Sequence, residues 1–180
     1  YTLVGFNSNV YDVPMLKMAL KEGTTNLSLK NLSDSIILRN LKPWDCEREF
    51  NLPEIKWLDH IDIIEPAPSV QVGLKLYGGR LHSKRLQDLP IEPDASITPE
   101  QRPSLVSYCY NDLETTIDLY KHIEPQLQLR TQMSEHYGVD VRSKSDAQIA
   151  EAVIRHELER IKGDKIYRPE FPHHYSFHYE

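Results

Sequence analysis

The stretch Tyr108–Thr116 constrains the fold of this 180-residue chain most strongly, because it has the pattern of the middle of one amphipathic helix. Apolar residues such as Leu105 and Ile117 continue the helical spacing on either side. Tyr108 and Asp112 are four positions apart, so a helix projects both side chains from one face, one turn apart. The sequence therefore predicts a phenol and a carboxylate aimed at a common point.

A second informative stretch opens the chain. Tyr1 to Phe6 is apolar and β-prone, which predicts a short buried strand. Polar residues then lead to Asp12, and Pro14 fits the first position of a helix. Asp12 is thus expected at a strand-to-helix junction, a place that often delivers functional groups.

The remaining pattern predicts an α/β fold in which helices outnumber strands. The segment 69–81 fits a strand and a helix equally well, and Pro125 is expected to kink or end the helix that carries Tyr108 and Asp112. The other expected elements are helices over 28–39, from Pro43, over 126–137 and from the Ser145 capping box to Lys162, and a largely buried strand over 57–64.

Composition narrows the classes of function. A formal net charge of −6 excludes a general polyanion binder, so contact with nucleic acid would need a local basic patch or bound metal ions. The two cysteines, Cys46 and Cys109, have no metal-motif spacing and are expected to be small apolar residues in a reducing compartment. No apolar segment has membrane length and no signal peptide is visible, so we expect a cytoplasmic protein without a membrane partner.

One local basic patch is present. The segment 73–86 contains Lys75, Arg80, His82, Lys84 and Arg85 and no acid. Arg80, Lys84 and Arg85 are therefore candidates for contacts to phosphate groups. An exposed loop made soluble by its cations explains the same pattern equally well.

Other polar and aromatic residues favour structural roles. His173, His174 and His178 lie in a stretch without helical pattern, which favours a solvated tail or an interdomain contact over a metal site. His60 is expected to be a hydrogen-bonded core histidine. Tyr77 and Tyr110 could stack on bases, but full or partial burial is expected for each.

Taken together, Asn7-x-x-x-Tyr11-Asp12 and Tyr108-x-x-x-Asp112 resemble the second and third motifs of the DEDD superfamily of 3′–5′ exonucleases, which has the ribonuclease H-like fold. The tyrosine, and Ser107 at the position where another subclass has histidine, point to the tyrosine subclass. The match is most similar to the exonuclease modules of phage DNA polymerases. It covers residues 1–125 best.

The resemblance implies a mixed sheet flanked by helices in an exonuclease domain over 1–125, followed by a helical extension and tail over 126–180. The superfamily also carries an Asp-x-Glu on a strand upstream of the asparagine motif, and no such strand precedes Tyr1. We therefore expect the first strands, with two of the four acidic ligands, to lie upstream of this sequence. The resemblance to phage polymerases implies the cytoplasm of a bacterial or phage-infected cell.

The same resemblance assigns roles to individual residues. Two Mg²⁺ or Mn²⁺ ions would be bound with help from Asp12 and Asp112, because hard cations prefer carboxylate oxygens. The counterpart of Asp112 binds the ion that activates water, and the counterpart of Asp12 supports the second ion. Tyr108 would orient the nucleophile, and Asn7 would lie near the 3′ end of the substrate. The alternative makes Asp12 a helix cap and Tyr108 a half-buried packing residue.

The implied reaction is two-metal hydrolysis of the terminal phosphodiester of single-stranded DNA, in a module that leads into a polymerase domain. One alternative is a catalytically inactive nuclease-like module that binds nucleic acid or a protein. Another is an RNA-trimming exonuclease of the same superfamily.

Overall fold

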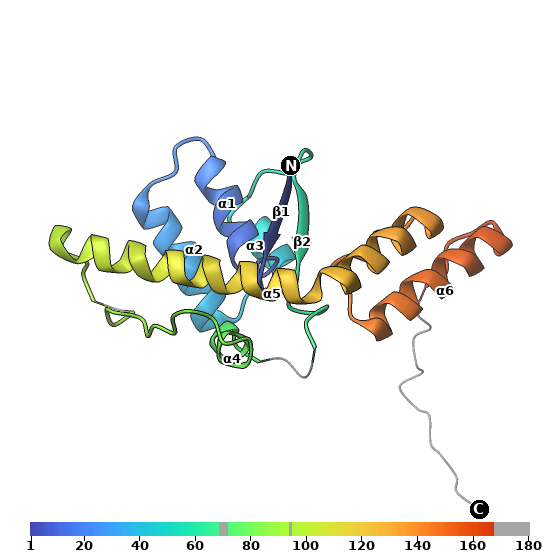
Figure 1. Cartoon of the computed structure of the whole chain (residues 1–180). Helices are drawn as coiled ribbons and strands as arrows, with labels where there is room; N and C mark the ends of the chain where they lie inside the picture. The colour runs from blue at the N-terminus through green and yellow to red at the C-terminus, as the bar shows by residue number, and fades with distance from the viewer. Residues whose placement is uncertain (69–71, 94, 168–180) are drawn as a thin grey trace, which may run out of the picture.

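The computed structural model describes residues 1–68, 72–93 and 95–167 and has a mixed α/β architecture that is mostly helical (Figure 1). In chain order, the described elements are β1 (Thr2–Gly5), α1 (Asp12–Leu20), α2 (Asn26–Arg39), α3 (Pro43–Glu49), β2 (Asp59–Asp62), α4 (Leu74–Arg80), a 3₁₀ turn (Pro99–Gln101), α5 (Arg102–Tyr137) and α6 (Asp146–Lys162). In Figure 1, α5 crosses the molecule with α4 on one side of it, while α6 lies at the far end.

The sheet of the described residues consists of two parallel strands. Thr2 pairs with Asp59 and Gly5 with Asp62, so both strands end at the same edge. A parallel pair needs a long crossover connection, which α1, α2 and α3 provide here. The second strand covers Asp59–Asp62 and is shorter than the predicted 57–64. Trp57 precedes the paired residues and is 74% exposed.

Two apolar clusters hold these elements together. One joins the strands to α4 and α5 through Ile63, Tyr77 and Leu119. The other joins α1, α2 and α3 around Leu32 and Cys46. Both cysteines are free, and Cys46 is buried in this second cluster whereas Cys109 is exposed.

Pro125 does not end the helix, since α5 runs through it from Arg102 to Tyr137 and includes the segment 126–137 that was predicted as a separate helix. Proline removes one backbone hydrogen bond, at a cost of about 3 kcal/mol. Leu119, Ile123 and Leu127 are all buried on the core side of α5, and each contributes roughly 1.5–3 kcal/mol by burial. Pro125 itself is exposed, so it takes no place in the core that these three residues form.

Several local expectations need smaller corrections. Helix α1 begins at Asp12, so Pro14 occupies its third position instead of the first. Leu20, which ends α1, is exposed. The ambiguous segment forms a helix over Leu74–Arg80. The predicted capping box at Ser145 is confirmed, and a second one forms at Thr98. Gly138 and Gly163 follow the ends of α5 and α6 in the left-handed conformation.

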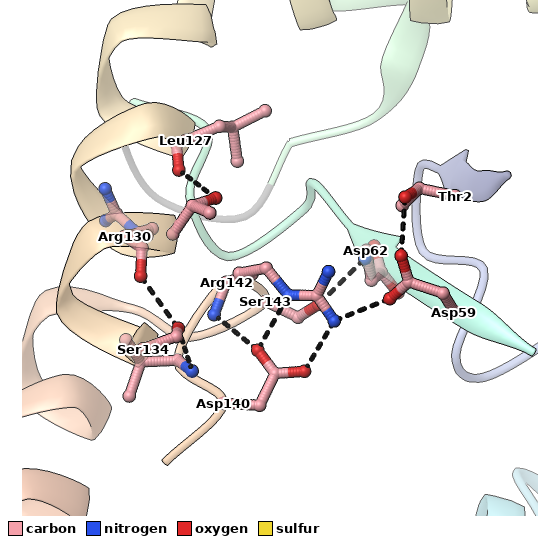
Figure 2. Close-up of polar contacts among 11 residues, drawn as sticks. Thr2, Asp59, Asp62, Leu127, Arg130, Ser134, Asp140, Arg142 and Ser143 are labelled. Atoms are coloured by element: carbon pink, nitrogen blue, oxygen red, sulfur yellow. Dashed lines mark hydrogen bonds and ion pairs between the residues drawn. The ribbon is translucent and has the colours of Figure 1, made fainter. Parts of the chain in front are cut away.

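The segment between α5 and α6 is fastened to β2 by a network of ion pairs and hydrogen bonds (Figure 2). The Arg142 guanidinium lies 2.7 Å from a carboxylate oxygen of Asp59 and 2.9 Å from one of Asp140. The hydroxyl of Ser143 accepts a hydrogen bond from the backbone N–H of Asp62 at 2.9 Å. The turn that leads into α6 is therefore tied to the strand that ends at the candidate site.

This network predicts a pH dependence of stability. Hydrogen bonds from Arg142 lower the pKa of Asp59 and of Asp140 below the ordinary value. Carboxylates with a lowered pKa stabilise the fold above their unfolded pKa of about 3.9, and that stability is lost as the pH falls through the folded pKa. Replacing Arg142 by glutamine should therefore weaken the fold at pH 7 and flatten its loss of stability in acid. Urea unfolding at about pH 7, 4 and 2.5 spans the titration and measures this effect. Parallel curves of unfolding free energy against pH for the variant and the parent would contradict it.

The predicted boundary at residue 125 falls inside α5, and the division into two domains stays a prediction. His173, His174 and His178 lie outside the described residues. Among the helices of the described part, none combines the length and apolar character needed to cross a bilayer.

Candidate functional site

The carboxyl edge of the small sheet gathers the first group of predicted site residues. Because β1 and β2 are parallel, the loop after Gly5 and the end of β2 at Asp62 lie together. This is the edge at which open α/β sheets commonly bind ligands. Asn7 lies two residues after the end of β1, and its positive φ of 57° marks a turn in the chain ahead of Asp12.

Asp62 holds this loop in place. Its carboxylate is 2% exposed and accepts hydrogen bonds from the backbone N–H groups of Asn7 and Asn9, both at 2.8 Å. A third bond comes from the N–H of Ile64 at 3.1 Å. A buried carboxylate with this many N–H donors is well satisfied and fixes the conformation of the loop that carries Asn7.

Asp12 begins α1 close to Asp62 and His60. Desolvation of the carboxyl group raises the pKa of Asp12, and a hydrogen bond from its own backbone N–H opposes this. The negative charge of Asp62 raises the pKa further, and His60 lowers it. His60 is itself partly buried and lies 2.9 Å from the hydroxyl of Ser8, as a hydrogen-bonded histidine should. Asp12 is therefore a carboxylate that the fold holds at an electrostatic disadvantage, which is frequent at functional sites.

This arrangement predicts that Asp12→Asn stabilises the fold at neutral pH. A carboxyl group with a raised folded pKa favours the folded state in acid, and this contribution is lost as the pH rises through the folded pKa. Asparagine removes the charge that Asp62 repels. At pH 7 we expect a higher melting temperature for the variant than for the parent. At pH 3, about one unit below the ordinary pKa of aspartate, the difference in melting temperature should be smaller because the carboxyl group of Asp12 is then protonated. Equal melting temperatures at pH 7 would show that the carboxylate of Asp12 is not destabilising.

The second group lies on α5 beside α4. Tyr108 and Asp112 share one face of α5, as predicted, and the Lys75 ammonium of α4 lies 5.9 Å from the centroid of the Tyr108 ring. Lys75 also pairs with Asp88 at 2.8 Å, which raises the pKa of Lys75, and the charges of Tyr108 and Asp112 act in the same direction. A phenol, a carboxylate and an ammonium thus converge here.

Partial burial raises the pKa of Tyr108, and the adjacent charge of Asp112 raises it further. The phenol therefore stays protonated at neutral pH and can donate a hydrogen bond. It can orient a water molecule or a phosphate oxygen, but it is unsuited to act as a base. This agrees with the orienting role that the resemblance assigns to Tyr108.

Helix α4 contacts both groups. Phe6, which precedes Asn7, packs edge-on against Tyr77 of α4 with ring centroids 5.8 Å apart. Tyr77 is 3% exposed, so its expected core role is confirmed, whereas Tyr110 is 64% exposed. Lys75, two residues before Tyr77, reaches Tyr108. The loop after β1 and the phenol of α5 therefore flank the same short helix.

The carboxylates of Asp12 and Asp112 match the oxygen donors that Mg²⁺ and Mn²⁺ prefer. Each interacts with its own surroundings, Asp12 with Asp62 and His60, and Asp112 with Tyr108 and Lys75. Across residues 1–68, 72–93 and 95–167, no three His, Cys, Asp or Glu side chains are grouped to hold a metal ion. Two carboxylates fit the ions by type but are fewer than the ligands that two ions take.

The predicted phosphate-contacting cations divide between two places. Arg80 ends α4 and is exposed, while Lys84 and Arg85 lie in the following turn and border a groove along α5. Sequence reasoning placed Lys75 in the basic patch but missed its position beside Tyr108. It also missed Asp62, for which the only signal was an acid at the end of an apolar strand.

Comparison of the chain with family models, with curated proteins and with solved structures gave no match.

Proposed function

We propose that this chain is part of a 3′–5′ exonuclease module that hydrolyses the terminal phosphodiester of single-stranded DNA by two-metal catalysis. The observation that carries the proposal is the position of α4 between the two motifs: Tyr77 contacts Phe6 beside Asn7, and Lys75 reaches Tyr108 beside Asp112. The resemblance supplies the reaction. The ribonuclease H-like arrangement of the sheet belongs to the same proposal.

In this proposal the residues of the chain have separate roles. Asp12 and Asp112 supply carboxylate oxygens, and the bound ions would activate water and stabilise the leaving oxygen. The protonated phenol of Tyr108 orients the attacking water. Lys75 offers a positive charge to the phosphate group beside Tyr108. Asn7, held through its backbone by Asp62, lies near the 3′ end of the strand.

The proposal places the remaining acidic ligands on a segment upstream of Tyr1. The test therefore compares residues 1–180 with the polypeptide extended by its natural upstream sequence. Each is incubated with DNA and RNA strands labelled at the 5′ end, with Mn²⁺ or with EDTA. We expect shortening from the 3′ end with Mn²⁺ in the extended polypeptide, faster for DNA, and none with EDTA.

The other outcomes separate the alternatives. Faster shortening of RNA would favour an RNA-trimming enzyme with the same chemistry. Strand binding without shortening in either polypeptide would favour a catalytically inactive module, as would an upstream sequence that lacks an Asp-x-Glu.

A further inference from the structure

A groove runs between α5 and the turn that follows α4. Residues 81–85 form one wall, and α5 between Asn111 and His122 forms the other. The groove has a volume of about 630 Å³, within the range of small-ligand sites. Asn111 lies three positions after Tyr108 on α5, so the groove begins next to the candidate site and continues along the helix to His122.

The walls of the groove are fixed by close packing. A Cβ atom on Gly78 would lie 2.9 Å from Leu86 and 3.0 Å from Thr115, so only glycine lets α4 approach α5 this closely. The turn itself is held at Ser83, whose N–H donates to the carbonyl of Gly78 at 2.9 Å and whose hydroxyl donates to Asp118 at 2.8 Å. The groove is therefore a built feature of the fold.

The floor of the groove holds an amide without a partner. Asn111 is 6% exposed, and its side chain makes no hydrogen bond to any described residue. No fully buried side-chain nitrogen or oxygen in the described residues lacks a partner, so the amide of Asn111 must reach the open groove. Water in the groove can satisfy this amide, and a ligand with a matching donor and acceptor can replace that water.

The rim is rich in cations. Lys84, Arg85 and Lys121 border the groove, and none of them forms an ion pair within the described residues. Two acids also border the groove, Asp118, whose carboxylate accepts the hydrogen bond from Ser83 and keeps its charge, and Glu114, so three cations face two acids. The rim of the groove therefore carries a net positive charge, although the whole chain has a net charge of −6.

We propose that this groove binds a single nucleic-acid strand, with phosphates on Lys84, Arg85 and Lys121 and a base edge on Asn111. The ligand rests on the proposed function, because the same strand would pass from the groove to the site beside Tyr108. A base edge offers both the donor and the acceptor that an amide needs, which a bare phosphate does not.

Binding is tested without hydrolysis, by fluorescence anisotropy of a labelled single-stranded oligonucleotide in EDTA. The variant Lys84→Gln/Arg85→Gln/Lys121→Gln should bind on the order of 30-fold more weakly at low salt. The slope of log affinity against log salt should fall by about 2, since each single-strand phosphate contact contributes about 0.7. The matched control is Lys56→Gln/Lys162→Gln/Lys165→Gln, which removes three exposed cations elsewhere and should change binding little.

Two single variants test the groove more sharply. Asn111→Ala should weaken binding about 5-fold and leave the salt slope unchanged, because it removes a neutral hydrogen bond. Glu114→Gln should tighten binding by about 3-fold, because it removes the opposing charge. Inorganic polyphosphate should compete poorly, and its competition should not depend on Asn111.

The proposal is overturned if the control triple variant weakens binding as much as the groove variant, or if Asn111→Ala and Glu114→Gln leave the affinity unchanged. Failure of the exonuclease proposal looks different, because strands would then bind through the groove without being shortened when Mn²⁺ is added. Melting curves of each variant establish that the fold is retained.

Discussion

Replacement of Asp62 by alanine is expected to lower the free energy of unfolding by about 3 kcal/mol. The side chain is 2% exposed and accepts three backbone N–H bonds, from Asn7, Asn9 and Ile64. Removing a buried acceptor leaves its donors unsatisfied, and hydrogen bonds to a charged group contribute roughly 1.5–3 kcal/mol each before relaxation. Some of this loss is recovered where Asn7 and Asn9 reach solvent.

Urea unfolding followed by circular dichroism measures the effect. Asp62→Asn is the informative companion, because its single carbonyl oxygen can replace part of the acceptor set, and it should fall between alanine and the parent. Hydrogen exchange at the amides of Asn7 and Asn9 should quicken in both variants. A change in unfolding free energy below about 0.5 kcal/mol, the size of an ordinary surface substitution, would show that Asp62 does not hold the loop.

In the polypeptide extended by its natural upstream sequence, Asp112→Asn is expected to reduce Mn²⁺-dependent shortening of DNA by about 10²- to 10⁴-fold while the fold is retained, a range typical of the loss of one charged active-site group. Asparagine keeps the shape of the side chain but removes the negative charge that a cation needs. The stability of α5 should change little, because the hydroxyl of Thr116 bonds to the backbone carbonyl of residue 112, which the substitution leaves in place. Loss of the Asp112 charge should also lower the raised pKa of Tyr108 toward its ordinary value.

The matched control is Asp118→Asn. This acid lies on the same helix, but it accepts a hydrogen bond from Ser83 and borders the groove instead of the Tyr108 site. It should retain most of the activity. Tyr108→Phe should lose about 10-fold, because it keeps the ring and removes only the orienting hydroxyl. Unchanged activity in Asp112→Asn would reject the assignment of the site.

Local chemistry was enough to predict much of the fold. The β-prone opening of the chain, the capping boxes at Thr98 and Ser145 and the glycines that end α5 and α6 depend on neighbours in sequence. The continuation of α5 through Pro125 does not depend on sequence neighbours. It depends on the packing of Ile123 and Leu127 in a core that includes residues of β2 and α4. Similarly, nothing local shows that Trp57 is left outside the strand.

The site divides in the same way. Helical spacing alone predicted that Tyr108 and Asp112 share a face, and the junction after β1 placed Asp12 at the start of a helix. Lys75 and Tyr108 are 33 residues apart in sequence. The hydrogen bonds by which Asp62 holds the loop after β1 join residues 53–55 positions apart. Such contacts follow from the pairing of β1 with β2 and the packing of α4 on α5, which periodicity does not encode.

The continuity of α5 also fixes a distance. From Asp112 to Gly138, 26 positions at 1.5 Å per residue separate the phenol-bearing end from the turn to α6 by about 39 Å. At that far end the Arg142 network fastens the same helix back onto β2. A macromolecule that binds α6 would therefore be connected through α5 to the helix face that carries Tyr108 and Asp112, and through the Arg142 network to β2.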